Sequence, residues 1–424
     1  MQTYITTKLN TADMKSILKQ VIKDIQPSKE YETEILRKAT AIIKKINASL
    51  KDAKAVLGGS GAKGTWLKTF DADIFVKFSY KKYADKSDQI SSILEKELKK
   101  HFSFKKLHGS RDYFQIQEGH YTFEIVPILD IKKASEAKNI TDVSPLHSQF
   151  VSRYKKLINE MRLTKQFFKA ANVYGAESHI QGFSGYVCEI LTIYYCSFEK
   201  LLKAIPSWKD KTVIDINNYY KGKNVLLSLN KSKLSSPLIV IDPVQADRNA
   251  AAALEYEKFE RIQGRARQFL KKPDIGFFEL KRPSIADLQK KYKNKPLLIL
   301  QASLLDKKDD IAGAKLRKAF HFIEKELERS GFGITEKDII WDEEPLLFFV
   351  LDKHELSPIV EIQGPFVHMK SHVVAFKKKY KKIKIANKRI VAQIKRKFTK
   401  PYDIASFIIS SENVKTNVAS IQVL

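Results

Sequence analysis

The chain has 424 residues, of which 43% are hydrophobic, 76 are Lys or Arg and 48 are Asp or Glu, so its formal net charge is +28. This composition excludes large-scale disorder, and the length predicts two to four domains rather than a single core. The excess of positive charge favours a polyanionic partner, although a lysine-rich surface that serves only solubility would give the same count.

Two further features bear on the cellular compartment. No apolar run approaches the length of a membrane span, and the chain does not open with a basic segment followed by an apolar one. Cys188 and Cys196 both lie in an apolar segment, and we expect them to be buried thiols. These features predict a cytoplasmic protein without membrane contact.

The first 60 residues predict a helix, a short strand and a glycine-rich turn. The helix carries one apolar stripe, made of Ile35, Ala39, Ile42, Ile43 and Ile46. A strand over 53–57 follows, and then the turn Gly58-Gly59-Ser60-Gly61 opens a short helix. Backbone N–H groups, a hydroxyl and the positive end of the helix dipole suit phosphate oxygens.

The next strand carries Asp71 and Asp73. Because side chains two residues apart on a strand share a face, we expect both carboxylates to converge. Each signal alone is weak, since a Gly-Ser turn is usually only a turn and an Asp-x-Asp pair is usually a solvated face. Together, and beside the apolar run 74–76, they require a counter-ion, which indicates metal-assisted phosphoryl or nucleotidyl transfer. The spacing is not that of Walker A, because Lys63 is followed by Gly64.

Alternation at period two then predicts a hairpin of strands 113–117 and 121–128. Glu124 on the second strand is our third candidate carboxylate, and we expect an antiparallel neighbour to bring it beside Asp71 and Asp73. Asp130 lies six residues further, roughly 20 Å along a strand, so it cannot share a metal with Glu124. An exposed strand residue is the alternative reading of Glu124.

From Thr141 the pattern changes to long helices. Residues 144–147 read as a helix start with His147 near its N-terminus, and 182–186 read as a tight turn that serves as scaffold. We expect Arg248 to open a helix that runs to residue 271.

Beyond Pro273 the sequence predicts a separate α+β unit of RNA-binding size. Its strands are expected at 297–301, 346–351 and 359–363, around an amphipathic helix that ends at Gly331. Basic residues then crowd together, and the candidates for phosphate contact are Lys377, Lys378, Lys381, Lys382, Arg389 and Arg396. A solvated charged face is an equally good reading of this stretch.

Several runs together resemble a known family. The run Gly59-Ser60-Gly61-Ala62-Lys63-Gly64-Thr65-Trp66-Leu67 ahead of Asp71-Ala72-Asp73 resembles the polymerase-β-type nucleotidyltransferases. Over nearly the whole chain the sequence resembles the archaeal, class I, CCA-adding enzymes, through the segments 144–147, 173–177, 182–186, 242–244, 248–254 and 364–365.

The resemblance implies an α+β multidomain fold. It implies a nucleotidyltransferase catalytic head over 1–142, a helical neck over 143–272 that recognises the nucleotide base, and a C-terminal α+β body and tail over 273–424 that binds tRNA. The implied activity is template-independent addition and repair of the 3′-terminal CCA of tRNA from CTP and ATP.

The resemblance also implies the site residues. Mg²⁺ is the implied cofactor, held by Asp71, Asp73 and Glu124, the last standing where the family typically has Asp. The implied nucleotide-binding residues are Gly59, Ser60, Lys63, His147, Lys165, Tyr174 and Arg248, with Arg248 reading the base edge and Lys165 and Tyr174 expected on one helix.

Two alternatives stay open. A poly(A) polymerase-like RNA nucleotidyltransferase would share the carboxylates and the turn but would extend general RNA ends with A. A non-catalytic basic RNA-binding protein would not need Asp71 or Asp73 at all. The sequence leaves open whether one chain adds all three nucleotides and whether it forms a homodimer.

Overall fold

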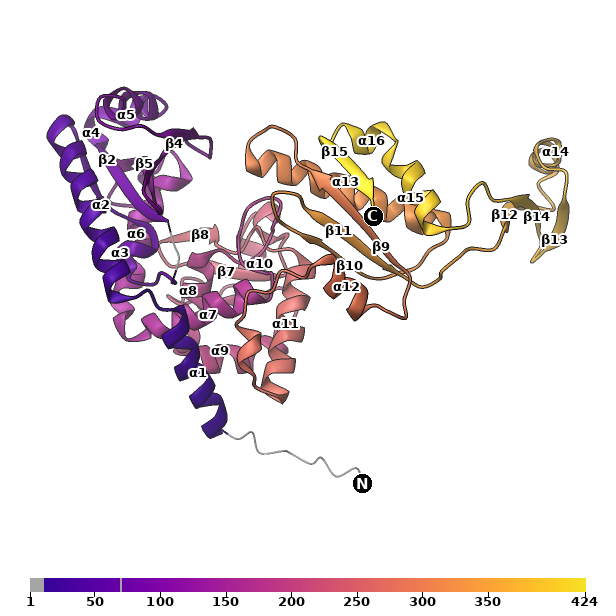
Figure 1. Cartoon of the computed structure of the whole chain (residues 1–424), viewed down its shortest axis with the longest axis horizontal. Helices are drawn as coiled ribbons and strands as arrows, with labels where there is room; N and C mark the ends of the chain where they lie inside the picture. The colour runs from indigo at the N-terminus through magenta and orange to yellow at the C-terminus, as the bar shows by residue number, and fades with distance from the viewer. Residues whose placement is uncertain (1–10, 69–70) are drawn as a thin grey trace. The chain divides into compact units, whose positions relative to one another are not determined.

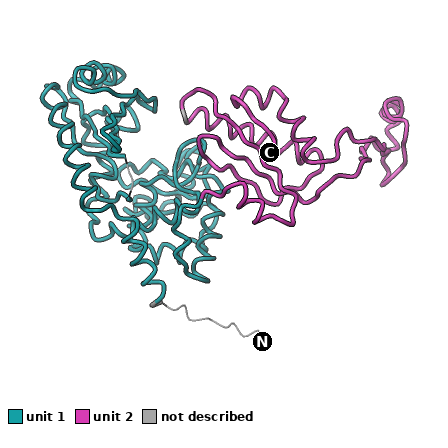
Figure 2. Tube along the Cα trace, viewed as in Figure 1, with its two compact units in different colours: residues 1–281 teal, residues 282–424 magenta. Residues whose placement is uncertain are grey.

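The computed structural model describes residues 11–68 and 71–424 (Figure 1). The first ten residues, on which the expected absence of a targeting segment rests, and Thr69 and Phe70 lie outside the described residues. The chain divides into two compact units, residues 1–281 and residues 282–424 (Figure 2). The further division of the first unit into head and neck stays a proposal.

The first part of unit 1 is a five-stranded mixed sheet with helices packed on it. Its strand order is β1-β2-β5-β4-β3. The elements are α1 (Thr11–Ile25), α2 (Lys29–Ser49), β1 (Ala53–Leu57), α3 (Gly59–Lys63), β2 (Ala72–Ser79), α4 (Tyr80–Tyr83), α5 (Ile90–Leu98), β3 (Lys105–Leu107), β4 (Tyr113–Glu118) and β5 (Tyr121–Asp130).

The predicted apolar stripe of α2 packs against this sheet. Ile35, Ala39, Ile42 and Ile46 are buried in one core with strand residues such as Ile74, whereas Ile43 is only partly buried at its edge. The expected helix, strand and short helix at the glycine-rich turn are α2, β1 and α3, so these predictions are confirmed.

The hairpin prediction is confirmed, but the direction expected for its neighbour is wrong. Strands β4 and β5 pair antiparallel, as predicted. Strand β5 pairs with β2 in parallel, not antiparallel, because α5, β3 and β4 intervene and form a crossover between the two. Parallel pairing still sets Asp73 opposite Glu124.

The second part of unit 1 is mainly helical with a small sheet of order β6-β7-β8. Helix α1, which the predicted boundaries assign to the head, packs on α7, with Met14 and Val21 buried in this second core. The elements are α6 (Ser144–Val151), α7 (Ile158–Ala170), α8 (Gly185–Tyr195), α9 (Phe198–Ala204), β6 (Thr212–Ile214), α10 (Val225–Ser228), β7 (Leu238–Asp242), β8 (Gln245–Asn249) and α11 (Tyr256–Lys271).

Three local predictions for this part are wrong. Arg248 lies on β8 rather than at a helix start, and α11 begins only at Tyr256, because Asp242 and Pro243 turn the chain back into a strand that pairs with β7. Tyr174 lies beyond the end of α7, in a bridge to Phe183. Cys188 is buried, but Cys196 ends α8 with a positive φ of 63° and is exposed.

Unit 2 is an α+β unit, as predicted. Its main sheet has the order β10-β11-β9-β15, and α13 and α15 share one core with it while α12 packs in a separate apolar cluster with β9 and β11. The elements are α12 (Ile285–Lys291), β9 (Leu297–Ser303), α13 (Asp309–Ser330), β10 (Ile334–Ile340), β11 (Leu346–Leu351), α15 (Pro401–Ile409), α16 (Glu412–Lys415) and β15 (Ser420–Val423). Gly331 ends α13 with a φ of +111°, which confirms the predicted stop.

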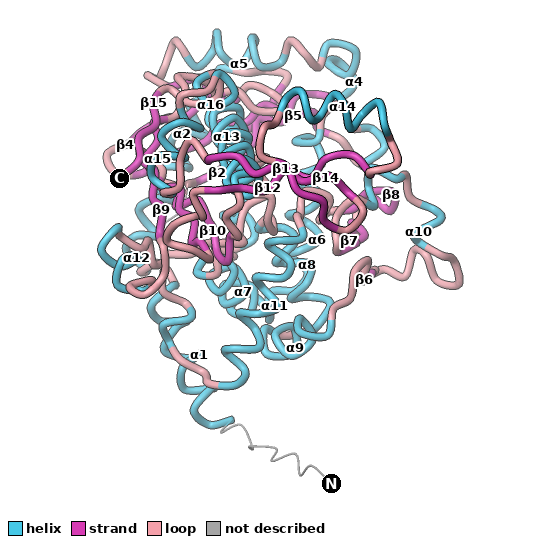
Figure 3. Tube along the Cα trace, turned by 90° about the vertical axis from the view of Figure 1, so that its right-hand side faces the viewer, coloured by secondary structure: helices cyan, strands magenta, loops and turns pink. Residues whose placement is uncertain are grey.

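A small subdomain within unit 2 carries the basic stretch. It comprises β12 (Ile359–Phe366), α14 (Lys370–Lys379), β13 (Ile383–Ala386) and β14 (Arg389–Lys395). The strands form a three-stranded sheet of order β12-β14-β13, and α14 lies beside them against β12 (Figure 3). No helix in the part of the chain that the structure describes has both the length and the apolar composition that crossing a bilayer requires.

Candidate active site

The carboxylate cluster forms where β2 and β5 run side by side. Asp73 and Glu124 are partners in the parallel register, on strands that lie about 4.8 Å apart. Asp71 precedes β2 and is exposed, whereas Asp73 and Glu124 are half-buried. The expectation that both aspartates share one strand therefore holds only for Asp73.

The three acids lie close enough to affect one another's ionisation. Burial raises the pKa of Asp73 to about 6, with Lys63 opposing the rise and Asp71 adding to it. Burial, followed by the charges of Asp73 and Asp71, raises the pKa of Glu124 to about 7. Over residues 11–68 and 71–424, no three His, Cys, Asp or Glu side chains already stand in the arrangement of metal ligands. A cation would therefore have to draw these oxygens together.

Asp130, the competing acid on β5, is excluded from this cluster. It is exposed at the end of the strand and forms a 2.6 Å ion pair with Lys77. These two side chains neutralise each other diagonally across the strands, because Lys77 lies opposite Ile128 and Asp130 lies opposite Ser79, two residues further along.

The glycine-rich turn at Gly58 and Gly59, called the glycine corner below, lies directly against Asp73. The amide of Gly58 donates a 2.8 Å hydrogen bond to the carbonyl of Asp73. Gly59 begins α3 with a φ of +53°, and a Cβ at this position would lie 1.6 Å from an Asp73 carboxylate oxygen. Only glycine allows this approach. Ser60, the next residue of α3, is partly exposed beside the corner.

Lys63 and Lys165 meet on a buried acid that the sequence did not single out, Glu189 of α8. Lys63 Nζ lies 2.7 Å from Glu189 Oε2, and Lys165 Nζ lies 2.6 Å from Oε1. Thr65 donates to Oε1 as well, at 2.6 Å, and accepts from Lys165 at 2.9 Å. Burial opposes ionisation of Glu189, but the two ammonium groups lower its pKa to about 2. The carboxylate thus holds both lysines beside Asp73.

Tyr174 lies next to this cluster. A Cβ on Gly185, the first residue of α8, would lie 2.6 Å from the Tyr174 hydroxyl oxygen and 3.7 Å from Cε of Lys165. Burial raises the pKa of Tyr174, so its phenol remains a hydrogen-bond donor at neutral pH.

His147 and Arg248 meet on a second buried acid, Asp242 at the end of β7. Arg248 NH1 lies 2.5 Å from Asp242 Oδ2, and His147 Nε2 lies 3.1 Å from the same oxygen. Tyr186 of α8 donates to Oδ1 at 3.1 Å, and its ring stacks on that of His147 with centroids 3.9 Å apart. The structure thus groups the predicted nucleotide-binding residues around two acids, with the glycine corner and the carboxylates near the first.

The basic residues of unit 2 separate into two kinds. Lys377 and Lys378 on α14, and Lys381 and Lys382 just after it, are exposed. The two arginines instead make contacts within unit 2. Arg389 stacks over the Phe366 ring at 3.8 Å, and Arg396 donates a 2.5 Å hydrogen bond to the carbonyl of Ser330 at the end of α13.

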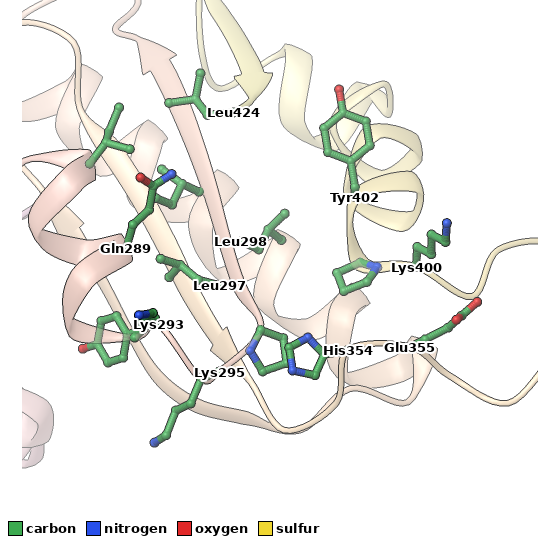
Figure 4. Close-up of a pocket in the computed structure, with 15 residues that line it drawn as sticks. Gln289, Lys293, Lys295, Leu297, Leu298, His354, Glu355, Lys400, Tyr402 and Leu424 are labelled. Atoms are coloured by element: carbon green, nitrogen blue, oxygen red, sulfur yellow. The ribbon is translucent and has the colours of Figure 1, made fainter.

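An open pocket of unit 2 contains none of the predicted site residues. It has a volume of about 630 Å³ and lies between α12, β9 and the start of α15 (Figure 4). Its lining mixes apolar side chains such as Leu298 with Lys293, Lys400 and Tyr402. The candidate active site is therefore identified by its buried charges and not from this pocket.

Family models match three consecutive parts of the chain. Residues 159–279 match "tRNA nucleotidyltransferase, second domain", and residues 298–421 match "CCA-adding enzyme, C-terminal domain". Residues 13–145, which contain the carboxylate cluster, match "Second Messenger Oligonucleotide or Dinucleotide Synthetase domain".

Curated relatives and solved structures agree with these matches. The chain is 40% identical to the CCA-adding enzyme of Nanoarchaeum equitans over 68% of this chain and 70% of that one. It is 32% identical to the CCA-adding enzyme of Methanocaldococcus jannaschii over 94% of this chain and 91% of that one. The solved Cid1 poly(U) polymerase bound to MgATP matches with a TM-score of 0.52 at 15% identity, over 63% of this chain and 99% of that one. This last likeness shows a nucleotidyltransferase fold, and the identities show that the chain belongs to the CCA-adding enzyme family of tRNA nucleotidyltransferases.

Proposed function

We propose that this chain adds and repairs the 3′-terminal CCA of tRNA, from CTP and ATP and without a nucleic-acid template. Membership of the CCA-adding enzyme family supports the activity. One observation carries the assignment of the site: Asp73 and Glu124 occupy paired positions on neighbouring strands, against a glycine corner that approaches Asp73 closely. Carboxylates that face one another beside a phosphate-sized turn suit nucleotidyl transfer.

Asp71, Asp73 and Glu124 are the residues that would hold Mg²⁺. The donor atoms are all carboxylate oxygens, which fits Mg²⁺ better than a softer metal. The raised pKa values of Asp73 and Glu124 fit as well. Burial opposes the ionisation of both groups, the charges of Asp73 and Asp71 add to the shift of Glu124, and a bound cation would offset both effects. When bound, the metal would supply activation of the tRNA 3′-hydroxyl and neutralisation of the departing pyrophosphate.

The triphosphate would lie over α3. Gly59 and Ser60 are the first two residues of α3, and an amide and a hydroxyl at a helix start can donate hydrogen bonds of the kind that phosphates accept. Lys63 keeps N–H groups besides the one directed at Glu189, because an ammonium has three donors. Lys165 is buried against the same Glu189 carboxylate and would contribute its charge, with Tyr174 beside it. His147 and Arg248 would contact the base and sugar.

We propose the division of labour that the family resemblance implies. Residues 1–142 form the catalytic head, residues 143–272 form the neck, and residues 273–424 bind the acceptor stem and its stacked arm. The exposed Lys377, Lys378, Lys381 and Lys382 would contact phosphates along the duplex, whereas Arg389 and Arg396 would act mainly by holding the subdomain in shape.

The test uses tRNA transcripts that end before CCA, after C and after CC, with Mg²⁺ and labelled CTP or ATP supplied separately. Ordered incorporation that stops after three nucleotides supports the proposal. Unlimited A-tailing of unrelated RNA would instead indicate the poly(A) polymerase-like alternative, and RNA binding without incorporation would indicate a non-catalytic binder. Asp130→Asn is the matched control for changes at Asp73 and Glu124, because Asp130 lies on the same sheet but pairs with Lys77.

A further inference from the structure

Asp242 is an acid with no solvent exposure that connects three parts of unit 1. Its side chain accepts from His147 of α6, Tyr186 of α8 and Arg248 of β8, and also from the backbone amide of Val244 at 3.0 Å. Burial opposes its ionisation, but the hydrogen bond from His147 and the charge of Arg248 lower its pKa, so it is a carboxylate at neutral pH.

The ion pair determines how the guanidinium of Arg248 is oriented. A guanidinium has five N–H donors in one rigid plane, and Asp242 engages NH1. The Arg248 side chain is held at two points, at NH1 by Asp242 and at its backbone by strand β8. The direction of its remaining N–H groups is therefore fixed. The Arg248 side chain is 27% exposed, whereas Asp242 is fully buried, so Arg248 is the partner of this pair that a ligand can contact.

The same acid sets the hydrogen-bonding state of His147. Because a carboxylate only accepts, the Nε2 atom that faces it carries the proton. Burial lowers the pKa of His147 against the opposing effect of Asp242, so the ring is neutral and Nδ1 is left as an acceptor. Stacking on Tyr186 fixes the ring plane.

The bases of CTP and ATP share a pattern that this arrangement can distinguish. Cytosine and adenine each carry an amino donor next to a ring-nitrogen acceptor, whereas uracil and guanine carry a carbonyl acceptor next to an N–H donor. N–H donors held in place therefore complement the ring nitrogen of cytosine and adenine and oppose the N–H of uracil and guanine.

We propose that Asp242 is a positioning residue for nucleotide selection: by anchoring Arg248 and fixing the tautomer of His147, it sets the donor and acceptor pattern that accepts CTP and ATP and rejects UTP and GTP. The proposal rests on the proposed function, in which Arg248 faces the base. It goes beyond it by assigning selectivity to a side chain that touches no nucleotide. A purely structural role would instead affect all four nucleotides alike.

The test measures kcat/KM for CTP, UTP, ATP and GTP with Asp242→Asn on tRNA transcripts that end before CCA and after CC. Asn keeps the shape but loses the charge and can donate as well as accept. We expect the ratio of kcat/KM for CTP over UTP, and for ATP over GTP, to fall at least about tenfold, through losses for CTP and ATP.

The matched control is Asp142→Asn, which removes an equally buried carboxylate from its 2.5 Å ion pair with Arg111 in the same unit. We expect it to lower stability and leave both ratios unchanged. If Asp242→Asn does not fold, Tyr186→Phe removes one hydrogen bond to Asp242 and keeps the stack on His147. Equal proportional losses for all four nucleotides in the variant that folds overturn the proposal. A wild-type protein without preference for CTP over UTP would instead contradict the proposed function.

Discussion

The shared carboxylate of Glu189 allows a prediction whose size follows from the structure. Glu189 is fully buried and lies within 2.7 Å of both the Lys63 and the Lys165 ammonium groups. Glu189→Gln keeps the volume of the side chain but leaves two cations next to each other in a buried site. Burial lowers the pKa of Lys165 even with Glu189 present, and its remaining hydrogen-bond partner, Thr65, is uncharged, so Glu189 is the anion that offsets its desolvation.

Two independent arguments give similar values for the free energy of unfolding that Glu189→Gln should lose. A carboxyl pKa that falls from its usual 4.5 to about 2 on folding contributes about 3 kcal/mol at neutral pH. Removing one partner of a buried ion pair costs about 3–5 kcal/mol. Because the folded-state pKa is the lower one, this stabilisation is complete above about pH 4.5 and is lost as the pH falls toward 2. We therefore expect Glu189→Gln to lose about 3 kcal/mol at pH 7 and about 2 kcal/mol at pH 3.5.

Urea unfolding followed by tryptophan fluorescence measures this loss. Trp66 and Trp208 lie in unit 1 and Trp341 in unit 2, so a Trp341→Phe background reports unit 1 alone. The control is Glu199→Gln on α9, which breaks a partly exposed 2.6 Å pair with Lys203 and should cost about 0.5 kcal/mol or less. A loss below about 1 kcal/mol at pH 7, or the same loss at both pH values, would refute the reasoning about a shared buried counter-ion.

Three further outcomes are expected. Asp73→Asn should lower the rate of nucleotide addition about a thousandfold or more with unchanged RNA affinity in a filter-binding assay; weakened RNA binding would mean that the acid serves the fold instead. Gly59→Ala should also abolish addition, because its Cβ would lie 1.6 Å from an Asp73 oxygen, and its circular dichroism spectrum should match wild type; full activity would show that the corner is not tight. Replacing both Lys381 and Lys382 by Gln should weaken tRNA binding and reduce the slope of log K against log salt by about 1.5, whereas an unchanged slope would place these lysines off the RNA.

Periodicity and turn chemistry predicted most of the elements that build the site. The stripe on α2, the hairpin of β4 and β5 and the stop at Gly331 are local patterns, and the structure confirms them. Parallel pairing of β2 with β5 could not be predicted, because it depends on a crossover through α5, β3 and β4 that no local pattern records.

Glu189 and Asp242 were missed as site residues for a physical reason. An acid within an apolar run indicates only that it needs a polar or charged partner. The partners of Glu189 lie 24 to 126 residues away in the sequence, so no local pattern identifies them. The available signal was the isolation of Glu189 among the apolar residues of α8, which follows the turn 182–186 that is interpreted from the sequence as scaffold. Asp242 likewise ends the fully buried strand β7, and from the sequence it is identified only as part of the segment 242–244 that resembles the family.

The third carboxylate poses the sharpest question about the site, because Glu124 stands where the family typically has Asp. Its register position lies directly opposite Asp73, and burial together with the charges of Asp73 and Asp71 raises its pKa to about 7. If metal binding requires both the charge of Glu124 and the length of its side chain, Glu124→Gln should lower kcat about a hundredfold or more. Glu124→Asp, which keeps the charge but retracts it by about 1.5 Å, should lose less than Glu124→Gln and still fall well below wild type.

Glu124→Gln and Glu124→Asp together distinguish a role in charge balance from a role as a metal ligand, which neither variant distinguishes alone. A role in charge balance alone would leave Glu124→Asp at wild-type activity, because the carboxylate remains within the field of Asp73. A role as a ligand requires contact, so the shorter arm must cost activity and raise the Mg²⁺ concentration at half-maximal rate. Wild-type activity in both variants would mean that Asp71 and Asp73 act without Glu124, and the cluster on β2 and β5 would then be a pair rather than a triad.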